Sequence, residues 1–349
     1  MSSKPIASAA EVARLAGVSR SAVSRTFTPG ASVSKETREK VMWAAEQLNY
    51  HVNHLARGLS KVESRPVCIL GSNLNAPYQA KLLDTLTKQL QSAGRAVMLI
   101  NTDGDKDSIN RALQQTLNYR AAATIVLSGT PGSEFVQSCI QSGQHVLLIN
   151  RNGQFEGSDH IQLDYQSAIH EAHHMLTRAG CRKLAIISST IQSPGLLSRE
   201  ALFQQCLTAE QTCELVRCGP TCYDSGAQAA KQLLASSQRP DGVFCVTDLL
   251  ACGFLDVAVQ EFGLPVPQEL CVVGFDNIEQ ASWAGYQLTT FSQPLDDMVA
   301  AIISRLKEVS EGEPQGKTIS FSAPLVWRNS VRYRASIHHF NDQTSKTLS

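Results

Sequence analysis

The stretch SAAEVARLAGVSRSAVSRTF, residues 8–27, contains two short helix signals on either side of a tight turn. Ser8 and Glu11 have the spacing of a capping box, in which the serine accepts a hydrogen bond from a free amide at the helix start. Gly17 predicts the turn, and Ser19 is typical of the cap of a second helix. Two short helices around a glycine-containing turn indicate a helix-turn-helix arrangement.

The second predicted helix, residues 20–27, is small and polar at its start. Small residues allow a helix to lie deep in a major groove, and arginine can bind guanine or clamp phosphate. A third helix is predicted over residues 35–48, capped by Ser34. Turns of this kind also occur in three-helix bundles that bind no DNA, so that alternative stays open here. The candidate DNA contacts in this segment are Ser19, Arg20, Ser21, Ala22 and Arg25.

Charge is unevenly distributed along the chain. The whole sequence has 31 basic and 31 acidic residues, so its formal net charge is zero. Residues 1–65 carry ten Lys or Arg and five Asp or Glu, a net charge of +5, whereas the remainder carries 21 and 26, a net charge of −5. A small basic module on a larger acidic body indicates that the module meets a polyanion.

The segment after the third helix is compatible with a short helix but is too short to be stable alone in water. Gly58 weakens it further. Leu55 and Leu59 have no core of their own nearby, and a leucine inserted into a minor-groove step would bend the duplex. The alternative is an ordinary linker whose leucines pack on a neighbouring domain. The sequence therefore predicts a DNA-binding domain over residues 1–50 and a hinge over 51–65.

Three stretches together resemble the lactose-repressor (LacI) family of bacterial transcription regulators: EVARLAGVSRSAVSR (11–25), VSKETREKVMWAAEQLNY (33–50) and NHLARGL (53–59). The resemblance covers essentially the whole chain and is most specific over residues 11–60. Two positions depart from the family pattern, since Val52 stands where proline is usual and residues 28–30 are Thr-Pro-Gly. The resemblance implies that Arg20 and Ser21 vary with the operator sequence, that Leu59 is the minor-groove wedge, and that the hinge contacts with DNA are Asn53, Ala56 and Leu59.

The rest of the chain alternates short apolar runs with helical stretches. This pattern predicts parallel sheets with helices on both faces, a doubly wound α/β fold, in two similar lobes. The predicted strands are 67–70, 97–100, 124–127, 146–149, 184–187, 242–246 and 270–274, and the predicted helices are 78–93, 107–119, 133–142, 165–179, 198–209, 224–236 and 248–262.

This body resembles the periplasmic-binding-protein-like sensor that the family carries. The resemblance implies an effector-binding and dimerisation domain over residues 66–334, in which the chain crosses between lobes near residues 162, 292 and 323. Residues 335–349 are predicted to be a flexible tail. They contain no leucine heptads, so we expect a homodimer without a coiled-coil tetramer tail.

Polar residues at the ends of the predicted strands are the candidate effector contacts, because ligands of such folds bind at the carboxyl ends of the strands. The family resemblance implies that Arg199 and Asp276 are the principal contacts. Asp248 and Asp276 could instead only cap the helices that follow them. A sugar, polyol or sugar acid fits a polar cleft best, and a nucleobase stays open. The full candidate set is Tyr78, Asn150, Arg199, Thr247, Asp248 and Asp276.

One motif favours an enzyme. Residues 170–174, HEAHH, match the zinc-hydrolase pattern HExxH through His170, Glu171 and His174. We reject this reading because the helix would be a peripheral crossover with no evident third ligand. The ten cysteines lack paired CxxC spacing, so no metal and no cofactor is expected.

Taken together, the residues predict a sequence-specific transcription regulator, a repressor rather than an enzyme, that binds a pseudo-palindromic operator in double-stranded DNA as a homodimer. A solute-binding protein without a role on DNA would share the body, but it should carry an export signal and no basic head. No stretch approaches the length of a membrane span. A cytoplasmic location without membrane association is therefore expected.

Overall fold

The computed structural model describes residues 7–28, 30–51, 65–102, 106–127, 133–151, 155–191 and 193–333. The chain divides into two compact units, residues 1–65 and residues 66–349, which we call the head and the body. The predicted fold class is confirmed: the head is a helical bundle, and the body is built on parallel sheets.

Three helices form the head. The capping box at Ser8 is present, with the Glu11 carboxylate accepting from the Ser8 backbone N–H at 2.7 Å. Gly17 ends the first helix at φ 67°, a left-handed conformation that glycine adopts without strain. Val12, Val23 and Val41 each come from a different helix and form the core together with several alanines. The helices are α1 (Ala9–Ala16), α2 (Arg20–Thr26) and α3 (Lys35–Gln47).

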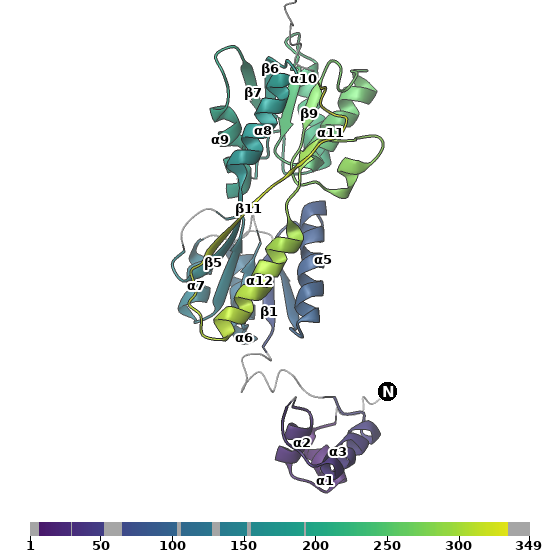
Figure 1. The fold of residues 1–349 in the computed structure, drawn as a ribbon, viewed down its shortest axis with the longest axis vertical. Coiled ribbons are helices and arrows are strands. Elements are labelled where there is room, and N and C mark those ends of the chain that lie inside the picture. The colour runs from purple at the N-terminus through teal and green to yellow at the C-terminus, as the bar shows by residue number, and fades with distance from the viewer. Residues whose placement is uncertain are drawn as a thin grey trace, which may run out of the picture. The chain divides into compact units, whose positions relative to one another are not determined.

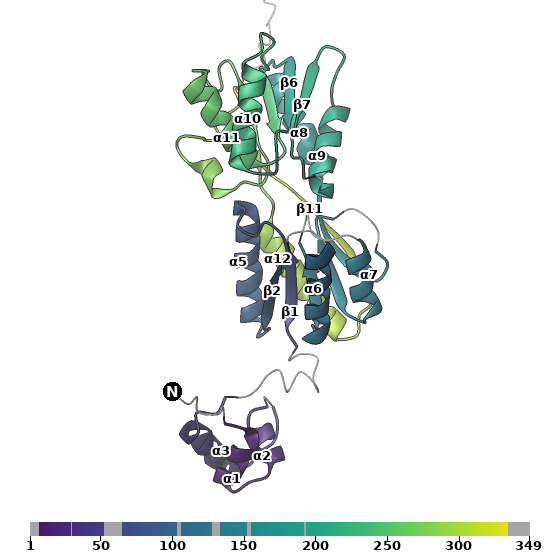
Figure 2. The same ribbon diagram turned by 180° about the vertical axis from the view of Figure 1, so that it is seen from behind.

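The first lobe of the body is a six-stranded parallel sheet with the order β11-β5-β4-β3-β1-β2. Alternate residues of each strand enter two cores: Val67 and Ile69 face α5 and α12, whereas Cys68 and Leu70 face α6 and α7 (Figures 1 and 2). The strands are β1 (Val67–Gly71), β2 (Val97–Asn101), β3 (Ala123–Val126), β4 (His145–Ile149), β5 (Ser158–Asp164) and β11 (Thr318–Ser322), and the helices are α5 (Pro77–Ser92), α6 (Lys106–Asn118), α7 (Ser133–Gln141) and α12 (Leu295–Ser310).

The second lobe is a four-stranded parallel sheet with the order β7-β6-β8-β9. Helices α8 and α9 pack together on one face, and α10 and α11 on the other (Figures 1 and 2). The strands are β6 (Lys183–Ile187), β7 (Thr212–Val216), β8 (Gly242–Cys245) and β9 (Cys271–Val273), the helices are α8 (Tyr165–Arg178), α9 (Pro194–Gln205), α10 (Tyr223–Leu234) and α11 (Asp248–Asp256), and two short turns of helix follow at η2 (Val257–Glu261) and η3 (Glu279–Ser282).

The chain passes between the lobes three times. The first passage follows the end of β5 at Asp164. The second lies between β10 (Thr290–Phe291) and α12, and the third between β11 and β12 (Leu325–Val326). β10 and β12 pair antiparallel, so the second and third passages lie side by side. The sequence prediction had placed these passages near residues 162, 292 and 323.

The structure corrects several predicted boundaries and adds helices and strands that were not predicted. Helix α9 begins at Pro194 rather than at residue 198, since proline is favoured in the first turn of a helix. The predicted helix 248–262 is α-helical to Asp256 and then continues as a π-helical turn. β5, β7, the β10–β12 pair, β11 and α12 were not predicted. β5 has the sequence SDHIQLD. Most of its polar residues are buried with hydrogen-bond partners, so this strand shows no apolar run in the sequence.

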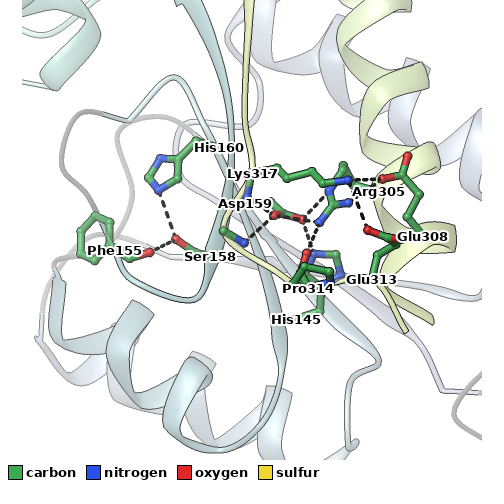
Figure 3. Close-up of polar contacts among 11 residues, drawn as sticks. His145, Phe155, Ser158, Asp159, His160, Arg305, Glu308, Glu313, Pro314 and Lys317 are labelled. Carbon is green, nitrogen blue, oxygen red and sulfur yellow. Dashed lines mark hydrogen bonds and ion pairs between the residues drawn. The ribbon is translucent and has the colours of Figure 1, made fainter. Parts of the chain in front are cut away.

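The buried carboxylate of Asp159 connects three elements of the first lobe (Figure 3). It accepts from His145 Nε2 on β4 at 2.8 Å and from Arg305 Nε on α12 at 2.9 Å. The backbone N–H groups of Gly316 and Lys317, before β11, donate at 2.9 and 2.8 Å. Burial opposes the charged form, but these hydrogen bonds outweigh burial and hold the pKa of Asp159 well below its usual range.

We expect Arg305→Met to lower the free energy of unfolding by about 3–5 kcal/mol, because it leaves a buried charge without its main partner. Lys317→Met, which removes exposed ion pairs with Glu308 and Glu313, should cost less than about 1 kcal/mol. Urea denaturation at pH 7 measures both. Since the pKa of Asp159 is lowered by folding, its contribution is present above pH about 4 and is lost as the pH falls further. Equal effects of the two variants would contradict this role.

Candidate functional site

The exposed face of α2 carries the residues predicted to contact DNA. Arg20, Ser21 and Arg25 are exposed, whereas Val23 and Thr26 on the opposite face are buried in the head. Ala22 is half-buried. One side of this helix is thus used for packing, and the other presents two guanidinium groups and small polar side chains.

The polar groups of this face are held in different ways. The Ser19 hydroxyl accepts from the Ala22 N–H at 3.2 Å and hydrogen bonds to the Ser21 hydroxyl at 2.8 Å, so it fixes the start of the helix. Within the described residues, neither Arg20 nor Arg25 forms an ion pair with a carboxylate. Their charges are therefore available to an anionic partner. The hinge candidates Asn53, Ala56 and Leu59 lie outside the described residues.

A cavity of about 130 Å³ lies between the two lobes of the body. The first lobe contributes the loop after β1 and the start of α5, and the second lobe contributes α9 and the ends of β8 and β9. Five of the six predicted effector contacts line it, namely Tyr78, Asn150, Arg199, Thr247 and Asp276.

Two of these residues stand at strand ends in conformations that L-residues rarely adopt. Asn150 follows β4 with φ 51°, and Asp276 follows β9 with φ 115°. Such backbone strain persists only where the surroundings impose it, and it is concentrated at binding sites. The side-chain oxygen Asn150 Oδ1 accepts from the Leu163 N–H at 3.1 Å, which turns the side-chain nitrogen Nδ2 toward Tyr78.

Arg199 and Asp276 form a buried ion pair in the second lobe. Arg199 Nη1 lies 3.2 Å from Asp276 Oδ1 and donates to the Val246 carbonyl oxygen at 2.6 Å. The guanidinium lies 3.8 Å above the centre of the Phe275 ring, which adds a cation–π contact. Burial raises the pKa of Asp276, and the charge of Arg199 opposes that rise. The two side chains therefore neutralise each other at the cavity wall.

Gln293, which the sequence reasoning missed, joins this pair to the first lobe. Its amide nitrogen donates to Asp276 Oδ1 at 2.7 Å. Its amide oxygen accepts from the Tyr78 hydroxyl at 2.6 Å and from Asn150 Nδ2 at 3.1 Å. Gln293 lies on the second passage between the lobes, outside any predicted strand or helix, so only the order of the passages could have pointed to it.

Three buried polar atoms of the cavity wall have no hydrogen-bond partner among the described residues: Tyr165 Oη, Arg199 Nε and Thr247 Oγ1. Each belongs to a side chain that is more than nine-tenths buried. A buried polar group without a partner is costly, and it is commonly satisfied by a ligand or by ordered water. The cavity is thus lined with donors and acceptors for a small polar molecule.

The sixth predicted effector contact, Asp248, lies elsewhere. It is fully buried and is not part of the cavity wall. Its carboxylate accepts from the Thr290 hydroxyl at 2.6 Å and from the Ile278 N–H at 3.0 Å. These contacts fix the turn that follows β9. The Asp248 side chain is directed into the lobe rather than into the cleft. This placement does not support a direct contact between Asp248 and an effector.

The HExxH motif is placed on α8. The side chain of His173 is buried and its Nε2 lies 2.8 Å from Gln211 Oε1, while His170 and His174 line a shallow surface hollow. Among the described residues, no group of three or more His, Cys, Asp or Glu side chains is arranged to hold a metal ion. None of the helices in the described part of the chain is long and apolar enough to cross a membrane.

These features define a class of protein: a two-lobed body with a cavity between its lobes, in one chain with a helix-turn-helix head. The family model "Bacterial regulatory proteins, lacI family" matches residues 9–53, and "Periplasmic binding protein-like domain" matches residues 173–331. The HTH-type transcriptional regulator AscG of Escherichia coli is 26% identical over 92% of this chain and 97% of its own. Catabolite control protein A of Priestia megaterium is 29% identical over 85% and 90%.

A solved structure of the lac repressor dimer bound to operator and the anti-inducer ONPF has the same fold, with a TM-score of 0.82, 23% sequence identity, and coverage of 93% of this chain and 99% of that chain. The chain belongs to the LacI family of bacterial regulatory proteins. It is a DNA-binding transcription regulator and not an enzyme, so the zinc-hydrolase alternative is set aside.

The position of Asp248 predicts a pH effect on stability. Burial, with the charge of Asp276 as the next cause, raises the pKa of Asp248 to about 7. Because folding favours the protonated form, this group stabilises the fold most below pH about 4, and the contribution is lost as the pH rises toward 7. In the unsubstituted protein, Asp248 should lower the free energy of unfolding by about 2–4 kcal/mol between pH 5 and pH 8. Asp248→Asn should abolish this part of the decrease. Urea denaturation of both proteins at the two pH values measures this, and parallel pH profiles would contradict it.

Proposed function

We propose that this regulator is a repressor whose affinity for its operator is set by a small polar effector bound between the lobes of the body. One observation carries the proposal: the wall of the cavity between the lobes contains a buried ion pair and three buried polar atoms that have no partner in the described part of the chain. In a regulator with a DNA-binding head, such a cavity is the natural place for a controlling ligand. Action on DNA implies a cytoplasmic location.

The effector that fits best is an uncharged sugar or polyol. Arg199 is already paired with Asp276, so the cavity wall offers no surplus positive charge to a sugar acid. Hydroxyl groups both donate and accept, which suits Arg199 Nε, Tyr165 Oη and Thr247 Oγ1 together. The Phe275 face is occupied by the Arg199 guanidinium, which leaves it unavailable for stacking on a nucleobase.

On the DNA side, we assign Arg20, Ser21 and Arg25 to base and phosphate contacts in the major groove, with Ser19 and Ala22 beside them. The domain boundaries that we propose are residues 1–50 for the head and 51–65 for the hinge, which would fold on DNA with Asn53, Ala56 and Leu59 at the minor groove. A homodimer would match a pseudo-palindromic operator. The operator-bound lac repressor, which has the same fold, is a dimer.

The two sites would be coupled through the lobes. The ligand contacts come from both lobes, so effector binding changes the free energy of lobe closure. Closure moves the first lobes of a dimer, and with them the spacing of the two hinges. Thermodynamic linkage requires that operator binding change effector affinity by the same factor. Whether the effector releases the repressor or recruits it depends on which closure state brings the hinges together.

For the effector site, we expect Arg199→Ala to abolish the rise in melting temperature that an active sugar or polyol produces, because the ion pair and one donor are lost. Arg182→Ala, an exposed arginine of the same lobe, should leave that rise unchanged. A thermal-shift screen of the full chain against sugars, polyols, sugar acids and nucleobases identifies the active compound first. Retention of the rise in the Arg199 variant would overturn this assignment, and hits confined to acids would overturn the uncharged class.

For the head, we expect Arg20→Ala or Arg25→Ala to weaken binding to the preferred genomic fragment by about 1–3 kcal/mol if the arginine reads a base. A phosphate contact would instead weaken all sequences alike and lower the salt slope by about one. Lys88→Ala, an exposed change on α5, serves as the control. Fluorescence anisotropy at two salt concentrations separates the cases, and unchanged binding in both arginine variants would contradict the proposed interface.

A further inference from the structure

Two buried cysteines of the second lobe lie beside each other. Cys181 precedes β6 and Cys271 begins β9, and both side chains are fully buried. Cys271 pairs in register with Gly242 of β8. A Cβ atom on Gly242 would lie 2.8 Å from the Cβ and 3.0 Å from the Sγ of Cys181. Cys181 thus fills the space that the glycine leaves open, on the face of the sheet that carries the Cys271 side chain.

One arginine contacts both sulfurs. Arg332 Nη1 lies 3.2 Å from Cys271 Sγ, and Nη2 lies 3.5 Å from Cys181 Sγ. The Arg332 backbone N–H also points at Cys271 Sγ, at 3.5 Å. The guanidinium is fixed by the carbonyl oxygens of Ala179 and Pro267, at 2.8 and 3.0 Å. A cation and an N–H group directed at one sulfur stabilise its thiolate form.

The neighbouring groups shift the pKa values of the two cysteines in opposite directions. Hydrogen bonding with Cys181 is the main cause that lowers the pKa of Cys271, Arg332 lowers it further, and burial and Asp241 oppose both. The same contact and burial raise the pKa of Cys181. As thiols, Cys181 can donate to the Asp241 carbonyl oxygen at 3.2 Å and Cys271 to that of Pro267 at 3.6 Å.

We propose that Cys181 and Cys271 form a reversible oxidation site, which a peroxide converts to a disulfide. The Cys271 thiolate attacks one peroxide oxygen, which breaks the O–O bond and gives a sulfenic acid and hydroxide. Solvent protonates the hydroxide. The sulfur of Cys181 then attacks the sulfenic sulfur, the S–S bond forms, and water leaves with the Cys181 proton. In total, two thiols and one hydrogen peroxide give one disulfide and two waters, and a thiol reductant reverses the change.

Arg332 connects this buried pair to the surface of the lobe. It contacts both sulfurs and is itself half-buried, and the neighbouring Tyr333 is 74% exposed. The site is also close to the cavity in sequence, because β9 continues directly into Asp276. Oxidation would tie the start of that strand to the turn before β6.

The first lobe supplies a matched control pair. Cys68 and Cys139 are also fully buried and lie close enough for the charge of one to affect the other. Burial raises the pKa of Cys68 to about 12 and that of Cys139 to about 11. These two thiols share the burial of the proposed site but are held in the unreactive form, so they separate the effect of Arg332 from that of burial.

The test exposes the full-length folded protein to hydrogen peroxide, blocks the remaining thiols with N-ethylmaleimide, and maps disulfides by mass spectrometry without reduction. We expect a Cys181–Cys271 link to form before any link of Cys68 or Cys139, and dithiothreitol should reverse it. Cys181→Ser should leave Cys271 as a sulfenic acid that dimedone traps. Arg332→Gln should slow formation of the link severalfold, since loss of the cation raises the pKa of Cys271 and lowers its thiolate fraction at neutral pH.

Circular dichroism melting curves show whether the variants are folded, and disulfide mapping in the unsubstituted protein does not depend on them. The proposal is overturned if the control pair oxidises as fast as Cys181 and Cys271. It is also overturned if the folded Arg332 variant reacts at the original rate. Neither readout requires DNA or an effector, so failure here leaves the proposed function untouched.

Discussion

The Asp276 carboxylate belongs to a hydrogen-bonded chain that connects side chains of both lobes through Gln293, which lies on a passage between them. Arg199 reaches this carboxylate from α9, and Gln293 reaches it from the segment that leads into α12. Gln293 in turn holds Tyr78 and Asn150 of the first lobe. A ligand that changes any one of these contacts changes the relation of the lobes, which is what a sensor requires.

Two buried aspartates of the body, Asp159 and Asp276, differ in how their carboxylates are hydrogen bonded. Asp159 is surrounded by donors from His145, Arg305 and two backbone N–H groups, so its charge is satisfied by the protein alone. Asp276 has two side-chain donors on one oxygen, and the wall around it retains polar atoms without partners. The first arrangement stabilises a lobe, whereas the second leaves room for a small molecule.

The head is built around a small core and an exposed helix face. Its core is small and built from valine and alanine, which places the helices close together and leaves one face of α2 free. The positive charge of residues 1–65 opposes the negative charge of the remaining chain. A basic surface with exposed arginines gains affinity for DNA mainly through phosphate, and specificity through the few side chains that reach base edges.

The fold class, the helix-turn-helix and the strand ends that carry Asn150 and Asp276 could be predicted from the sequence alone. These features depend on local rules: capping at Ser8 and Ser19, buried runs that alternate with helices, and ligand sites at strand ends. Only the tertiary structure decided that Gln293 joins the lobes, that Asp248 is directed into the protein, and that Cys181 lies beside Cys271. Those pairings join residues 17 to 215 positions apart. No local pattern encodes them, because they are fixed by the passages between lobes and by strand register.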